Sequence, residues 1–212
     1  MAITMSQDTS AAAAGRTYGG MSAEERARSR RQRLIEAAGA VIAEHGVAAL
    51  TAEQVCQTAG LTKRYFYAEF SGKDDLLDVC AEQLFSRLWT AMDGALAAAS
   101  EAERVRATAQ AVVYTLASDQ ASARLYVECA AFPQLRGRQQ RAIREFSARL
   151  AADAMPFTGH PPTGIRRDLA ARIVTAGTTD LIVDWLQGNV ETDEETIIAT
   201  IAAAALGAAS KA

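Results

Sequence analysis

The chain has 212 residues, half of them hydrophobic, which fits one domain or two unequal ones and supplies enough apolar side chains for a sizeable core. Its 22 Lys and Arg against 25 Asp and Glu give a formal net charge of -3, so any nucleic-acid site requires local clustering of positive charge. No apolar run approaches the roughly 18 residues that span a bilayer, the first twenty residues lack the pattern of a secretory signal, and three widely spaced cysteines do not suggest a disulfide framework. We therefore expect a cytoplasmic protein with no membrane partner.

The first 21 residues are mostly small and polar and are punctuated by glycine. This composition predicts a disordered N-terminal extension over 1–21. Met21 is an alternative to Met1 as the start of translation.

A first helix is expected from Ser22 to His45. Ser22 followed by Glu25 is the pattern of a capping box, and Gly46 is suited to end the helix. The apolar residues of this segment share one continuous face, which predicts a helix that packs against a core.

Abundant alanine, the absence of proline before Pro133 and the lack of long apolar–polar alternation favour helix nearly everywhere. The predicted fold class is all-α, with about nine helices. The expected further helices are 52–59, 62–69, 73–98, 102–118, 121–131, 134–154, 166–187 and 193–209. Residues 156–164, with three prolines and two glycines, predict a loop.

Two short helices are predicted close together within residues 50–77. Thr51 can cap the first, with Gln54 completing a capping box, and Thr62 can cap the second. Gly60 lies between them, where a left-handed residue is wanted. Two short helices joined by a tight glycine turn predict a helix-turn-helix.

Burial of the apolar residues leaves Lys63, Arg64, Tyr65 and Tyr67 pointing outward from the second helix. In a helix-turn-helix this face enters the major groove, where Arg and Lys suit guanine and Tyr can contact a phosphate or a thymine methyl. Upstream lies an acid-free cluster of arginines that can address phosphates, formed by Arg26, Arg28, Arg30, Arg31 and Arg33.

Each of these features also has a structural explanation. A helical hairpin with a glycine turn is often only structural, and an arginine run is often a solvated face. Exposed tyrosines beside Lys-Arg, paired caps and the adjacent arginines together favour binding to double-stranded DNA.

Residues 22–77 resemble the TetR family of transcriptional regulators. The resemblance rests on the following residues: Thr51, Val55, Ala59, Gly60, Leu61, Thr62, Tyr67, Phe70, Lys73, Asp74, Asp75 and Leu76. It implies phosphate contacts from Thr51, Thr62, Tyr67 and Lys73 and base contacts from Lys63, Arg64 and Tyr65. The chain departs from the pattern at Arg64, where a small residue is usual, and at Glu69, where His is frequent.

The resemblance implies a helix-turn-helix domain over 22–70 and a larger ligand-binding and dimerisation domain over 71–212. Large aromatic and sulfur-bearing side chains would suit an apolar or amphipathic effector. The expected pocket residues are Phe85, Trp89, Met92, Tyr114, Arg124, Glu128, Cys129 and Phe146. The last two long helices would pair with those of a second copy, through Val174, Gly177, Leu181, Trp185, Ile197, Ile201 and Ala205; an intramolecular pair is the alternative.

We therefore predict a homodimeric repressor that an unidentified small molecule releases from a palindromic operator. The alternative is a helical protein-interaction adaptor that has lost DNA binding, which Glu69 favours. The sequence lacks paired metal-ligand motifs, nucleophile elbows and phosphate-binding loops, so we expect neither an enzyme nor a cofactor nor a metal site.

Overall fold

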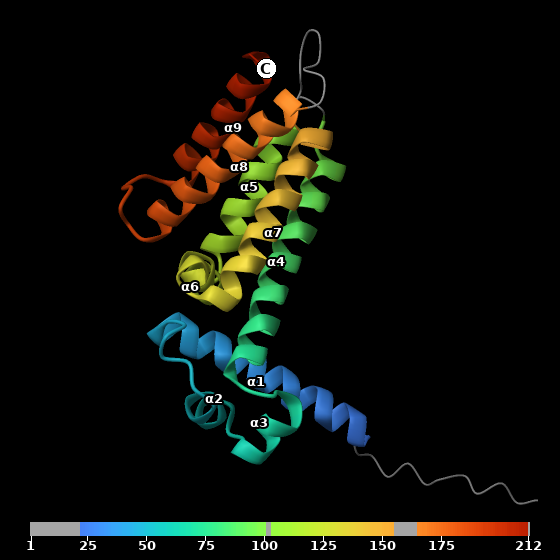
Figure 1. The fold of residues 1–212 in the computed structure, drawn as a ribbon, viewed down its shortest axis with the longest axis vertical. Helices are drawn as coiled ribbons and strands as arrows, with labels where there is room; N and C mark the ends of the chain where they lie inside the picture. Colours follow the sequence, from blue (N-terminus) through green and yellow to red (C-terminus); the bar gives the residue numbers. More distant parts are fainter. Residues whose placement is uncertain (1–21, 101–102, 155–164, 212) are drawn as a thin grey trace, which may run out of the picture.

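The computed structural model describes residues 22–100, 103–154 and 165–211, and these form nine α-helices, one 3-10 turn, one π turn and no strand (Figure 1). The elements are α1 (Ala23–His45), α2 (Ala52–Ala59), α3 (Lys63–Glu69), α4 (Lys73–Ala98), α5 (Arg104–Ala117), α6 (Gln120–Glu128), η1 (Cys129–Ala131), α7 (Pro133–Arg149), η2 (Leu150–Ala154), α8 (Ile165–Leu186) and α9 (Glu194–Lys211). The predicted all-α class is confirmed. The expected extension over 1–21 and loop over 156–164 lie outside the described residues.

Helices α1, α2 and α3 form a small unit at one end of the molecule, and the C-terminal helices lie at the other (Figure 1). The capping box at the start of α1 is present, with Ser22 and Glu25 bonding each other's backbone amides. Leu34, Ala38 and Ile42 form a fully buried face of α1 that packs against the other two helices. Helices α2 and α3 are each too short to be stable alone, so they depend on this packing, which also fixes the angle between them.

Helix α4 is the continuous link between this unit and the larger bundle (Figure 1). Its lower half buries Leu76 and Leu77 against the small unit, and its upper half buries Leu84, Leu88 and Met92 among the bundle helices. A single rigid helix therefore spans both parts of the molecule. Within the described segments no helix has the length and apolarity needed to cross a membrane.

Two predicted helices end differently from expectation. The segment predicted as 121–131 is helical to Glu128 and then tightens into η1, and the segment predicted as 134–154 loosens into a π turn after Arg149. Tight and wide turns are common at helix ends, where the last carbonyls lack partners within the helix. The composition that predicts helix there carries no signal for the type of the last turn.

Candidate nucleic-acid interface and inner cavity

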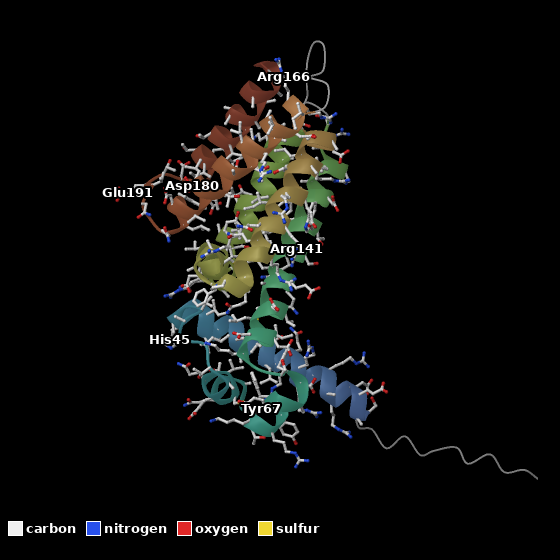
Figure 2. All side chains as sticks on the ribbon, viewed as in Figure 1. His45, Tyr67, Arg141, Arg166, Asp180 and Glu191 are labelled. Atoms are coloured by element: carbon white, nitrogen blue, oxygen red, sulfur yellow. The ribbon has the colours of Figure 1, made fainter. Side chains whose placement is uncertain are left out.

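The outer face of α3 carries Lys63, Arg64, Tyr65 and Tyr67, all exposed, while Phe66 on the opposite face is fully buried. Tyr67 is 60% exposed, an unusual position for an aromatic side chain, and Figure 2 places it at the end of the molecule far from α8 and α9. Two cations and two aromatic rings are thus presented together on one short helix.

The turn before α3 sets the direction of this face. Gly60 adopts a left-handed conformation with φ of 62° and ψ of 38°, which glycine reaches without steric cost. Its amide donates to the carbonyls at the end of α2, and the Leu61 amide donates to the Cys56 carbonyl at 2.9 Å. The chain therefore reverses within two residues and starts α3 at Lys63.

The predicted caps of these two helices need correction. Thr51 does cap α2, accepting from the Gln54 amide at 3.2 Å, but the Gln54 side chain accepts from the Thr51 hydroxyl instead of the Thr51 amide. The reciprocal capping box is therefore not closed. Thr62 precedes α3 as expected, yet its side chain makes no capping hydrogen bond, so the exposed hydroxyl does not serve the helix end.

Lys63 forms an ion pair that sequence reasoning missed. Its ammonium donates to the Glu53 carboxylate of α2 at 2.9 Å, with both side chains largely exposed. This hydrogen bond raises the pKa of Lys63 and lowers the pKa of Glu53. Arg64 makes no such pair with any residue that the structure describes, so it is the more available cation of the two. The signal in the sequence was the acid in the first turn of the neighbouring helix.

Three of the five arginines expected to address phosphates are engaged inside the small unit. Arg31 donates to the Glu69 carbonyl at 2.9 Å and stacks on Phe70, Arg33 donates to the Ala59 carbonyl at 2.6 Å, and the Arg30 guanidinium lies 4.9 Å from the centre of the Tyr65 ring. These contacts tie α1 to the ends of α2 and α3. Lys73, the first residue of α4, is exposed beside this surface.

A small cavity lies inside the bundle, between α4, α5, α6, α7, α8 and α9. Its volume is about 80 Å³. Two of the predicted pocket residues, Met92 and Phe146, line it. The rest of its wall is formed by Leu88, Val105, Thr108, Ala109, Val112, Tyr126, Leu150, Val174, Thr175, Thr178, Thr179, Ile182, Ile201 and Ala205. The threonines at 175, 178 and 179 were missed, although their spacing places them on one side of a helix.

Six of the predicted pocket residues lie elsewhere, and four of these are aromatic or sulfur-bearing. Tyr114 is exposed on the outside of α5, and Cys129 is buried in the core, where burial raises the pKa of its thiol to about 12. Phe85 and Trp89 line an outer groove between α4 and α7. The Trp89 ring also packs on the Phe146 ring, with 4.4 Å between the ring centroids. The prediction counted aromatic and sulfur-bearing residues without knowing which face of each helix turns inward.

Arg124 and Glu128, predicted as polar ligands, instead join α6 to the end of α1. Arg124 donates to the carbonyls of Ala43 and Glu44 at 3.2 and 3.1 Å, and Glu128 accepts from the Val47 amide at 2.8 Å. The two side chains also pair with each other at 3.0 Å. We refer to this contact as the α1–α6 clamp. His45, in the last turn of α1, marks its place in Figure 2.

The outer face of α8 and α9 differs from the predicted one. Val174, Ile197, Ile201 and Ala205 are buried within the chain, and Leu181 and Trp185 are partly buried against its core, Trp185 donating to the Thr192 carbonyl at 2.9 Å. Only Gly177 is exposed as expected. The large apolar side chains that α8 and α9 expose are Ile165, Leu169, Ile173 and Leu206. The buried residues pack within the chain, because α8 and α9 turn those faces to the bundle. The homodimer itself stays a prediction.

Within the described segments no three His, Cys, Asp or Glu side chains are grouped to hold a metal ion.

Residues 34–80 match the family described as bacterial regulatory proteins, tetR family, which covers α2, α3 and the parts of α1 and α4 that support them. No curated protein matches the chain. The solved structures similar to it include the fatty acid degradation regulator FadR from Bacillus halodurans, with a TM-score of 0.70 and 18% identity, covering 84% of this chain and 95% of that one.

Two further similar structures are a TetR-like transcriptional regulator from Rhodococcus sp. RHA1 and the multidrug binding protein EbrR complexed with malachite green. The first has a TM-score of 0.63 and 18% identity over 83% of this chain and 93% of that one. The second has a TM-score of 0.63 and 22% identity over 82% and 97%. At these identities the likeness establishes a shared fold that extends over both parts of the molecule.

Proposed function

We propose that this protein is a dimeric repressor that a small apolar or amphipathic ligand releases from a palindromic operator. The proposal starts from the match of residues 34–80 to the tetR family, which identifies the chain as a DNA-binding transcriptional regulator of that type. The observation that carries the proposal is the exposed face of α3, where Lys63, Arg64, Tyr65 and Tyr67 stand together on a buried support.

In this proposal α3 enters the major groove. Arg64 reads a guanine through a guanidinium that pairs with no described residue, and Tyr65 and Lys63 contact neighbouring bases. Thr51, Thr62, Tyr67 and Lys73 contact phosphates and fix the register. Arg30, Arg31 and Arg33 hold α1 against α2 and α3, and the parts of these guanidiniums that face solvent add positive charge near the DNA backbone.

A second copy of the chain would dock on the exposed side of α8 and α9. Ile173 is 72% exposed and Leu169 50% exposed on one side of α8, with Gly177 following them and Leu206 on α9. A row of large apolar side chains in water is costly, and small residues beside it allow close helix approach. Two helices from each copy would form a four-helix interface with two-fold symmetry.

The cavity and the α1–α6 clamp supply a route from ligand to DNA. Tyr126 lines the cavity from α6, and the same helix carries Arg124 and Glu128, which hold the end of α1. A ligand that displaces α6 therefore acts on the helix that supports α3. It can change DNA affinity only as far as it prefers one conformation over the other.

A salt titration of binding to random duplex DNA tests the proposal against the adaptor alternative. Fluorescence anisotropy of a labelled duplex would be followed with the full-length chain between low and physiological salt. We expect log affinity to fall steeply and linearly with log salt, because each phosphate contact releases counterions. A flat response, or no binding at low salt, would favour the adaptor.

A further inference from the structure

The cavity inside the bundle has an unusual chemical character, because its wall contains no charged side chain among the described residues. Eleven of its sixteen lining residues are aliphatic or aromatic hydrocarbons or methionine, four are threonines and one is Tyr126. An ionised ligand would lose its hydration there without gaining a counter-charge, which disfavours its binding. The wall therefore selects against both carboxylates and ammonium groups.

The hydroxyl groups of the cavity divide into two kinds. Thr108, Thr175 and Thr179 each donate to a carbonyl four residues earlier in their own helix, at 2.8, 2.9 and 2.9 Å. The hydroxyl protons of these three threonines are therefore already engaged in hydrogen bonds within their helices. The Thr178 side chain makes no hydrogen bond with any described residue, and Thr178 lines the same cavity.

Tyr126 is the second hydroxyl donor that lacks a close acceptor. Its hydroxyl lies 3.4 Å from the Thr179 hydroxyl, longer than the roughly 2.5–3.0 Å of a good O–H···O bond. Burial raises the pKa of Tyr126, so the phenol stays protonated at neutral pH. A buried donor without a close acceptor costs free energy, which a suitable ligand oxygen would recover.

The size of the cavity limits the ligand. A volume of about 80 Å³ is well below the roughly 150 Å³ of an apolar cavity known to hold benzene. An aromatic ring therefore enters only if side chains of the wall move aside. Met92 is the side chain best suited to yield, because it is unbranched and flexible.

We propose that this cavity binds a compact, uncharged ligand with an apolar body and one acceptor oxygen, such as a ketone, ester or lactone, held by hydrogen bonds from Tyr126 and Thr178. This rests on the proposed function, since it names the ligand class of the same effector site. It assigns Tyr126 as the residue that distinguishes an oxygen-bearing ligand from a pure hydrocarbon of the same shape.

Four single-ring probes test the assignment by calorimetry on the full-length chain without DNA. They are acetophenone, ethylbenzene, benzoate and benzylammonium, which share a ring and differ in the attached group. Acetophenone is expected to bind tightest, and the two ions at least about tenfold more weakly than acetophenone because their charge is unpaired in the cavity. Tyr126→Phe should weaken acetophenone by roughly three- to tenfold and leave ethylbenzene within about twofold.

Tyr114→Phe is the matched control, because it makes the same chemical change on an exposed tyrosine outside the cavity and should alter no affinity. Benzoate or benzylammonium binding as tightly as acetophenone would overturn the assignment, as would an unchanged acetophenone affinity in Tyr126→Phe or the absence of binding by all four probes. A probe that binds as expected but leaves DNA affinity unchanged would count against effector control and not against the ligand class.

Discussion

Arg64 and Lys73 are exposed cations close to the DNA-facing surface that make no ion pair within the described chain, but they stand in different places. Arg64 lies in the first turn of α3, where a side chain reaches base edges, and Lys73 begins α4, at the border of the surface. From these positions we expect Arg64 to contribute sequence specificity and Lys73 to contribute affinity.

Arg64→Ala should cost roughly 1–3 kcal/mol of operator binding and relax the preference at one base pair in each half-site. Lys73→Ala, its matched control, should weaken all sequences alike and lower the salt slope by about one unit. Sequencing of duplexes selected by each variant measures both effects. An unchanged motif for Arg64→Ala would show that this residue does not read a base.

Glu53→Gln should strengthen binding to any duplex, because it frees the Lys63 ammonium from its ion pair and removes a negative charge near phosphate. The salt slope should rise by about one unit. Since the pKa of Glu53 is lowered, the pair is complete above the ordinary range of a carboxyl group and is lost as the pH falls through that lowered value. The difference between wild type and variant should therefore shrink on acidification; a constant difference would mean that Lys63 is not the cause.

At the scale of helices, the α1–α6 clamp is a second contact, beside α4, that joins the small unit to the bundle. Gly46 follows α1 with φ of 83°, and a Cβ there would lie 2.8 Å from the Glu128 carboxylate. The clamp therefore depends on a glycine for both its backbone conformation and its space.

Arg124→Gln should leave the affinity for ligand unchanged but weaken the effect of ligand on DNA affinity. The reason is that it removes the guanidinium that donates to the Ala43 and Glu44 carbonyls. Arg87→Gln, a change to an arginine that pairs with Asp119 instead of α1, is the control. Ligand affinity measured with and without DNA checks this. Full coupling in Arg124→Gln would place the route elsewhere.

Ile173→Arg should give a folded monomer, because the side chain is exposed on the chain and would carry charge into the contact between copies. Ile201→Arg should instead destabilise the fold itself, since Ile201 is buried in the core. Light scattering and thermal unfolding of both variants separate these effects. A stable dimer in Ile173→Arg would exclude this face as the interface.

The sequence alone predicts the helices of the molecule well, because alanine content, caps and a 3.6-residue period are local properties. The α3 face also follows from the sequence, because burial of Phe66 and Phe70 determines what remains outside. The cavity wall does not, since Tyr126 and Thr178 meet only through packing of helices distant in the chain. The same reason explains why Ile201 and Ala205 were expected at a surface. An apolar helix face in the sequence does not indicate whether it packs against the same chain or against a second copy.

At the scale of the whole molecule, the proposed function links the cavity to α3 through α6 and α1, and it requires ligand and operator to influence each other reciprocally. The coupling of two such sites is typically about 1–3 kcal/mol, and operator DNA must weaken ligand binding by the same factor by which ligand weakens operator binding. Titration of a cavity ligand with and without saturating operator measures it. Equal affinities would show that the ligand is no inducer, however tightly it binds.

Selection of bound duplexes from a random library by the full-length wild-type chain tests the central claim, sequence-specific DNA binding by a symmetric dimer. Two copies of α3 related by a two-fold axis must reach half-sites about 34 Å apart, or a near multiple of that spacing. We predict an enriched palindrome whose half-site centres are separated by one such interval and whose enrichment is lost in Arg64→Ala. Recovery of no motif, or of a motif without two-fold symmetry, would contradict the account.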